Sequence, residues 1–266
     1  MFSEDYLKMN PGKFKIYIPY IVYIYINLIY YFFLVSINYH NLFEEYPEIF
    51  ELYLGCDDFK RKMSSAENEN NQNILHCAII YDDDIRIIKK LIEAGCSVTK
   101  QDDQGRTPIH LAMMYKRKCC VSFFNEEFQR IIAYKENHNK DEKEIFLNEL
   151  KLVLNSEEIK ICTEKCLENY KKFFEIYNHD GYTILHLAIK LGYIDFVSTM
   201  LDFAKMFEIN VLDHELLGSG DSILQVALKH SKNDIANIIL EKIPESINYP
   251  NYSGCIPKET NYLNFV

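Results

Sequence analysis

Three histidines recur in the same local context, and they are the residues whose type first suggests chemistry. An imidazole can act as a general acid or base near neutral pH, or it can bind a metal ion. His76, His110 and His186 each occupy the fourth position of a six-residue motif, so their shared spacing follows a repeat and not an active site. The copies are Asn73-Ile-Leu-His-Cys-Ala78, Thr107-Pro-Ile-His-Leu-Ala112 and Thr183-Ile-Leu-His-Leu-Ala188. No Gly-rich phosphate loop, nucleophile elbow or H-E-x-x-H motif accompanies them, and we predict neither an enzyme nor a cofactor.

The eight cysteines are a second set of potentially reactive side chains. None of them forms a C-x-x-C pair, and two lie within the repeat units, where small apolar residues belong. Cys162 and Cys166 alone have a spacing open to metal binding, but no second ligand pair accompanies them. We therefore predict reduced thiols and no metal site.

The charge balance restricts the class of partner. Asp and Glu number 39 against 29 Lys and Arg, which gives a formal net charge of −10. An acidic chain repels the phosphate backbone of nucleic acid and complements a basic protein surface. We predict no direct nucleic-acid ligand, and the 48% of hydrophobic residues is ample for a folded core.

One N-terminal segment is long and apolar enough to cross a bilayer as a helix. Ile16–Ile37 contains no charged residue, and lysines precede it while Glu44 and Glu45 follow it. Its six tyrosines and its internal Pro19 are unusual for an anchor. Three interpretations stay open: a transmembrane anchor, misassigned non-coding sequence before the true start, and a buried packing segment.

A fourth, looser copy of the motif completes an internal repeat. It reads Ser222-Ile-Leu-Gln-Val-Ala227, and the anchor positions His76, His110, His186 and Gln225 are 34, 76 and 39 residues apart. A unit of about 33 residues leaves about 43 extra residues in the middle gap. One long insertion therefore interrupts the array, and we expect it at 117–175 as an extra helical hairpin or as a partner-binding arm.

The residues of one unit predict a pair of helices. Gly105 permits a tight turn of positive φ, Thr107 can cap the helix that follows, and Pro108 suits its first position. In the first copy the acidic turn at 82–84 ends a short helix, and Gly95 ends a second one. The apolar face of that second helix comprises Ile85, Ile87, Ile88, Leu91 and Ile92. Neither helix can bury its apolar stripe alone, so each pair must stack on the next.

With its flanking turns, the motif resembles the ankyrin repeat, T-P-L-H-L-A followed by a turn, a second helix and a D-x-x-G finger. The resemblance implies an all-α ankyrin-repeat solenoid of about four to five helix-turn-helix units, with a helical insertion and an N-terminal hydrophobic helix. It also implies that each histidine bonds neighbouring turn backbone. The expected parts are a hydrophobic segment at 1–40, a degenerate helical cap at 41–66, repeats at 67–116, the insertion at 117–175, and repeats with a terminal half repeat at 176–266.

Three features further resemble the NF-κB inhibitor family of the IκB/Cactus-like type. They are Leu91-Ile-Glu-Ala-Gly-Cys96 followed by Asp102-Asp-Gln-Gly-Arg-Thr-Pro108, an insertion after the repeat at Thr107, and the half repeat Asn251-Tyr-Ser-Gly-Cys-Ile-Pro257. The resemblance covers about residues 67–115 and 176–260. It implies a protein that binds a Rel/NF-κB dimer through its basic nuclear-localisation segment and keeps it in the cytoplasm, with or without shuttling to the nucleus.

Acidic and aromatic residues on the expected fingers and first helices are the candidates for binding such a basic segment, since complementary charge sets orientation and speeds encounter. For each residue taken alone, an ordinary solvated turn or surface position is the favoured interpretation. These candidates are Asp82, Asp83, Asp102, Asp103, Tyr115, Asp180, Tyr182, Asp213 and Glu215.

The sequence departs from the family at both ends. No D-S-G-x-x-S degradation motif precedes the repeats, no acidic tail follows Asn261, and Tyr46–Leu54 reads as the remnant of an earlier helix pair. Signal-induced destruction is therefore unsupported. Alternatives to a Rel inhibitor stay open: a generic ankyrin scaffold or adaptor, a viral-type decoy of host Rel factors, and a membrane-tethered ankyrin protein.

Overall fold

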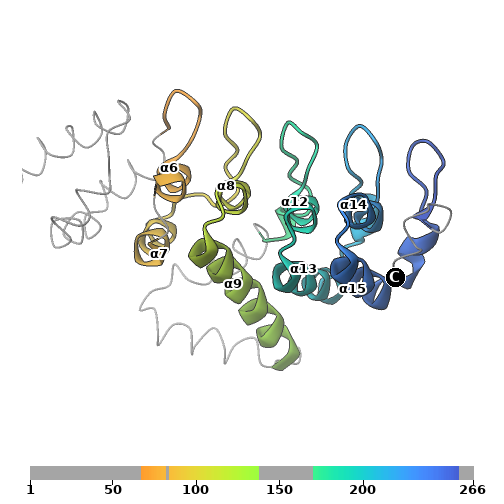
Figure 1. Cartoon of the computed structure of the whole chain (residues 1–266). Coiled ribbons are helices and arrows are strands. Elements are labelled where there is room, and N and C mark those ends of the chain that lie inside the picture. Colours follow the sequence, from red (N-terminus) through yellow and green to blue (C-terminus); the bar gives the residue numbers. More distant parts are fainter. Residues whose placement is uncertain (1–66, 82–83, 138–169, 258–266) are drawn as a thin grey trace, which may run out of the picture. The chain divides into compact units, whose positions relative to one another are not determined.

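The computed structural model describes residues 67–81, 84–137 and 170–257, which fold as helices joined by turns. They divide into two compact units, one containing α6 (Ile74–Tyr81) and nearly all of α7 (Ile85–Glu93), the other running on from Val98 (Figure 1). Ile16–Ile37, the expected cap at 41–66 and the centre of the insertion lie outside the described residues. Within the described ranges, no helix combines the length and apolar character needed to span a bilayer.

The first unit is a single helix pair. Asn73 caps α6, because its Oδ1 accepts the His76 N–H at 3.1 Å while its own N–H donates to His76 Nδ1 at 3.2 Å. Of the break predicted at 82–84, the structure describes Asp84, which is not helical and directly precedes α7. Gly95 follows α7 with a φ of +91°, as predicted for its C-cap. On the predicted inner face of α7, Ile88 and Leu91 are buried, while Ile85, Ile87 and Ile92 are half-buried.

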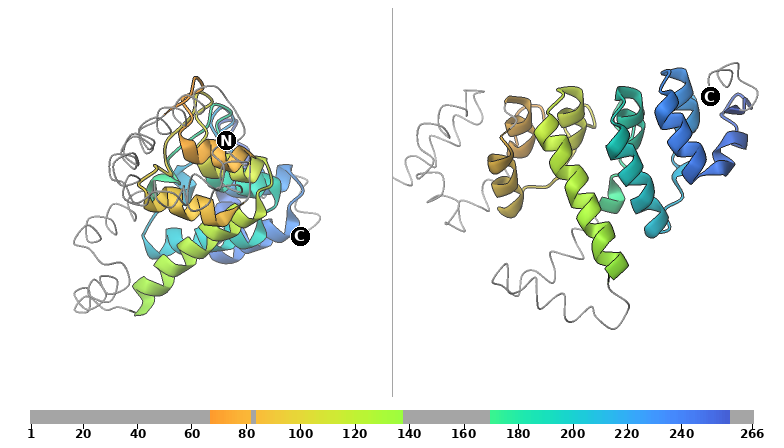
Figure 2. Two further views of the ribbon diagram at one scale, coloured as in Figure 1. Left: turned by 90° about the vertical axis from the view of Figure 1, so that its left-hand side faces the viewer. Right: turned by 60° about the horizontal axis from the view of Figure 1, so that its bottom comes forward.

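The second unit is a stack of helix pairs. Its first helices are α8 (Pro108–Met114), α12 (Ile184–Leu191) and α14 (Ile223–Lys229), and its second helices are α9 (Lys118–Asn137), α13 (Ile194–Met206) and α15 (Asn233–Lys242). Neighbouring first helices contact each other, as do neighbouring second helices, so the pairs stand side by side in two layers (Figure 2). Short 3-10 helices η1 (Val211–Asp213) and η2 (Pro244–Asn248) follow α13 and α15. The motif alanines of this unit, Ala112, Ala188 and Ala227, are fully buried, which lets the layers approach closely.

Each first helix of this unit begins at a hydroxyl residue followed three positions later by an amide or imidazole. Thr107, Thr183 and Ser222 are the N-caps, and the residue at the third helical position bonds back to each cap. Pro108 takes the first position of α8, as predicted. These starts are fixed locally by sequence.

The helix α9 begins the segment expected as an insertion, and it serves as the partner of α8. Phe128 of α9 contacts Phe196 and Phe203 of α13, with ring centroids 5.8 and 5.0 Å apart. It also contacts Phe173, which lies just before the turn at 178–182, at 6.2 Å. The remaining insertion helices expected from apolar spacing fall in 138–169, outside the described residues.

The turns before the first helices form fingers that project on one side of the stack and bond to one another (Figure 1). The fingers are residues 102–106, 178–182, 216–221 and 251–255. The His179 N–H donates to Gln104 O at 2.9 Å, and the Tyr252 N–H donates to Ser219 O at 3.2 Å. The bond between the fingers at 178–182 and 216–221 joins different positions, since the Leu217 N–H donates to Gly181 O at 3.2 Å.

The position of this bond differs because the third finger of this unit, residues 216–221, is longer than the others. The other fingers are closed by a bond between residues four apart, such as the Asn178 N–H to Tyr182 O at 3.0 Å. In this one the Leu216 N–H donates to Asp221 O at 2.9 Å, so the loop holds one additional residue. Gly218 and Gly220 both adopt positive φ to accommodate it.

A buried side chain also joins each first helix to the next finger, as the repeat resemblance implied for the histidines. His110 Nδ1 accepts the Thr107 N–H at 3.2 Å, so Nε2 carries the proton and donates to Tyr182 O at 3.3 Å. Gln225 Nε2 donates equivalently to Cys255 O at 2.7 Å. His186 is the exception, because its buried Nε2 has no hydrogen-bond partner where it faces the longer finger. Burial, reinforced by nearby His214, lowers the pKa of His186 from 6.5 to about 4.

The turns between first and second helices share one left-handed residue. Lys116, Gly192 and Ser231 have φ values of +55°, +86° and +53°. In each turn the next N–H bonds to a carbonyl five residues earlier, as the Lys232 N–H does to Ala227 O at 2.9 Å. Only Gly192 adopts this conformation without the steric cost of a Cβ.

We expect Ser231→Gly to raise the free energy of unfolding by about 0.5–1 kcal/mol, because glycine relieves the positive φ. The reverse change at the equivalent position, Gly192→Ser, should lower it by a similar amount. Urea unfolding at neutral pH measures both. Equal stability of all three proteins would show that this turn carries no strain.

The buried His186 predicts a loss of stability in acid. The unfolded chain takes up a proton near pH 6.5 but the folded chain only near pH 4, so stability present above pH 6.5 is lost as the pH falls toward 4. His186→Gln should keep the helix cap, as Gln225 does, and should lose about 3 kcal/mol less than the parent across this range. Urea unfolding at several pH values tests this, and parallel pH profiles for the two proteins would contradict it.

Candidate protein-binding surface

Two of the exposed carboxylates of the second unit lie at neighbouring finger tips. Asp103 and Asp180 are exposed in neighbouring fingers, which the bond from the His179 N–H to Gln104 O holds side by side. Their carboxylates stand where a partner's cations could reach them, so these two predicted residues share a surface.

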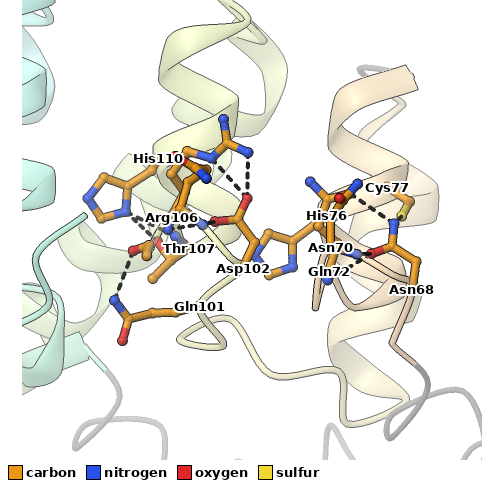
Figure 3. Close-up of polar contacts among 12 residues, drawn as sticks. Asn68, Asn70, Gln72, His76, Cys77, Gln101, Asp102, Arg106, Thr107 and His110 are labelled. Carbon is orange, nitrogen blue, oxygen red and sulfur yellow. Dashed lines mark hydrogen bonds and ion pairs between the residues drawn. The ribbon is translucent and has the colours of Figure 1, made fainter. Parts of the chain in front are cut away.

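Asp102, predicted beside them, has a different environment. It is buried, and its carboxylate accepts the Gln104 N–H at 2.9 Å and the Arg106 N–H at 2.8 Å (Figure 3). The Arg106 guanidinium adds an ion pair at 2.7 Å. Burial opposes ionisation of Asp102, but the bonds from Arg106 and Gln104 outweigh it and hold the pKa of this carboxyl below its usual value. Asp102 therefore shapes its finger, and a partner contact through it would have to break these bonds.

The two aromatic candidates, Tyr182 and Tyr115, lie at opposite ends of the first helices. Tyr182 is half-buried in its finger, and the Lys190 ammonium lies 4.2 Å from its ring centroid. Tyr115 is exposed at the opposite end of α8, beyond Met114. Tyr115 is thus not brought together with the finger carboxylates.

Asp213 and Glu215 lie just before the third finger of this unit. They interact with Tyr249 and Tyr252, which the sequence patterns did not single out. Asp213 is exposed in η1, and Glu215 is half-buried. A hydrogen bond with Glu215 and partial burial raise the pKa of the Tyr252 phenol, and burial with Glu215 raises that of Tyr249. Tyr252 is 64% exposed, and its ring lies against the backbone of Gly220, where a Cβ would meet it at 2.1 Å. The abundance of tyrosine was the only sequence clue to this cluster.

The first helices themselves carry cations that are paired within the chain. Lys229 forms an ion pair with Asp221, which also accepts from Asn251 Nδ2 at 3.0 Å. Lys190 lies over Tyr182. Arg106, in the finger before α8, pairs with Asp102. The first helices contain no Asp or Glu, so the negative charge near them lies in the fingers.

In the part of the chain that the structure describes, no cluster of side chains is arranged for catalysis or metal binding. The three histidines lie in separate helices as helix caps, and no three His, Cys, Asp or Glu side chains there are placed to hold a metal ion. The five cysteines in the described ranges are free thiols. Burial raises the pKa of Cys77 to about 11 and that of Cys96 to about 12, which keeps both protonated. Cys162 and Cys166 lie outside the described residues. Asp82 and Asp83 do as well.

Comparison with known families matches this architecture. A family model of ankyrin repeats in three copies matches residues 40–134, and a single ankyrin-repeat model matches residues 180–214. The first match ends within α9, which agrees with the role of that helix as the second helix of a repeat.

Individual relatives add a narrower similarity. The NF-kappa-B inhibitor cactus of Drosophila melanogaster is 25% identical over 152 residues, covering 57% of this chain and 27% of the relative. The cactus protein of Drosophila yakuba is 25% identical over 160 residues, covering 59% and 28%. The chain thus matches little more than a quarter of the length of these relatives.

Among solved structures, the ankyrin repeat domain of Bcl-3, described as a unique member of the IkappaB protein family, aligns with a TM-score of 0.50. The alignment covers 79% of this chain and 72% of that one, and at 20% identity it supports the fold alone. Ankyrin repeats are a protein-interaction fold and not an enzyme family. The chain is therefore an ankyrin-repeat protein, a protein-binding module related in sequence to NF-κB inhibitors of the Cactus type.

Proposed function

We propose that the chain inhibits a Rel-type transcription factor by binding its basic nuclear-localisation segment and retaining it in the cytoplasm. The observation that carries the proposal is the pair of exposed carboxylates, Asp103 and Asp180, on fingers bonded side by side. The similarity to the cactus inhibitors supplies the kind of partner.

The finger geometry suits an extended basic segment. Carboxylates on successive fingers form a row, and a row of cations in an extended peptide can meet it without any change in the fingers. Asp213 and Glu215 extend the negative charge toward the next finger, where Tyr252 offers an exposed aromatic face. Lysine and arginine side chains interact favourably with both kinds of group.

Binding through such a charged rim depends on salt. Exposed charge pairs contribute about 0.2–1 kcal/mol each and weaken as ions screen them. An adaptor that used an apolar surface would lack this dependence, which separates the two functions.

The test is retention of a Rel-homology dimer carrying its nuclear-localisation segment by the immobilised full chain. We expect retention at low salt that decreases as the salt concentration rises. Asp103→Asn with Asp180→Asn should weaken affinity by about five- to tenfold, the effect expected for two charged rim contacts.

The matched control removes two exposed carboxylates elsewhere in the same unit, Asp195→Asn with Asp234→Asn. This control should bind as the parent does. Failure of the parent chain to retain the dimer at low salt would refute the inhibitor function, and equal weakening by both double variants would refute the finger surface as its site.

A further inference from the structure

The turns between first and second helices of the second unit lie side by side, at the end of each pair away from the fingers. The Tyr193 hydroxyl, in the second of these turns, donates to Met113 O of α8 at 3.1 Å. Gly192 lies next to the third turn, since a Cβ added there would meet Lys232 Nζ at 3.1 Å. The turns at 115–117, 191–193 and 230–232 therefore form one continuous surface.

Large apolar side chains are exposed on this surface. Met114 and Tyr115 are 42% and 49% exposed, and Leu191 and Ile194 are 39% and 40% exposed. A single exposed apolar residue is ordinary, but four on two adjoining turns form a patch of the kind that marks an interaction site.

Cations surround the apolar residues. The turns carry four cations, Lys116, Arg117, Lys118 and Lys232, against the two carboxylates Asp195 and Asp234, in a chain of net charge −10. Lys190 and Lys229 are not counted, because they contact Tyr182 and Asp221 of the fingers. Lys116 and Lys118 are exposed beside Tyr115, and Lys232 is half-buried beside Gly192. The charge of these turns is thus opposite to that of the finger tips.

Lys116 also occupies the left-handed position of its turn, at a φ of +55°. Glycine fills the equivalent position in the next turn and costs nothing there, whereas lysine brings backbone strain. What lysine adds in return is an exposed cation at the centre of the patch.

We infer that these turns are a second binding surface, which takes an acidic amphipathic segment of a partner protein. Met114, Tyr115, Leu191 and Ile194 would bury the apolar face of such a segment, while Lys116, Lys118 and Lys232 would meet its carboxylates. The inference stands apart from the proposed function, because the finger surface is acidic and lies about 12 Å away, the length of a first helix of eight residues.

The test uses the full chain and a labelled 16-residue peptide with leucines at helical i, i+3, i+4, i+7 spacing and glutamates elsewhere. A second peptide has lysines in place of the glutamates. Fluorescence anisotropy at 50 mM salt should show at least tenfold tighter binding of the glutamate peptide. Lys116→Gly with Lys118→Gln should weaken that binding by about fivefold or more, although Lys116→Gly should raise the stability of the fold.

Lys172→Gln with Lys205→Gln removes two exposed cations of the same unit elsewhere and should leave the binding within twofold of the parent. Leu191→Gln reports the apolar contact and should weaken binding without changing its salt dependence. Equal affinity for the two peptides, equal loss in both lysine variants, or capture of phosphatidylserine vesicles without capture of the glutamate peptide would overturn the inference. None of these outcomes depends on whether the chain binds a Rel dimer.

Discussion

The stack depends on hydrogen bonds for the polar backbone groups that lie between its apolar surfaces. Each helix pair must bury its apolar stripe against the next pair, and this brings finger backbone together with helix N-termini in places that water cannot reach. Direct bonds between fingers and the imidazole of His110 or the amide of Gln225 supply the missing partners. At His186 the longer finger removes this partner, so one joint of the unit holds an unsatisfied buried nitrogen. Apolar packing around Ala188 and Phe203 must offset that cost.

The residues that stabilise the fold differ from those that a ligand could contact. Residues that close fingers or cap helices, such as Asp102 and Thr183, are used within the fold and offer little to a ligand. The exposed side chains at the tips and at the inter-helix turns differ in charge, since Asp103 and Asp180 are acidic whereas Lys116 and Lys118 are basic. The second unit presents carboxylates at one end of its first helices and cations with apolar residues at the other. The two proposed surfaces would let the chain hold two unlike segments at once.

Much of the fold follows from local sequence. Thr107, Pro108 and Gly95 start and stop helices where their chemistry predicts, because capping and positive φ depend on neighbouring residues only. The candidate site was harder to predict. Asp102 and Asp103 are identical in type and adjacent, yet the turn buries one and exposes the other. The packing of Tyr252 on Gly220 and the role of α9 arise from contacts between residues distant in sequence, which a repeat pattern does not encode.

The proposed function requires that a basic segment binds across the fingers of the second unit. Hydrogen exchange of the full chain, with and without a Rel-homology dimer, tests this binding most directly because it reports on each backbone segment. We expect added protection in the fingers at 102–106 and 178–182, with little change in α13 and α15. Protection confined to those second helices, or none in the fingers under conditions where the dimer is bound, would contradict it.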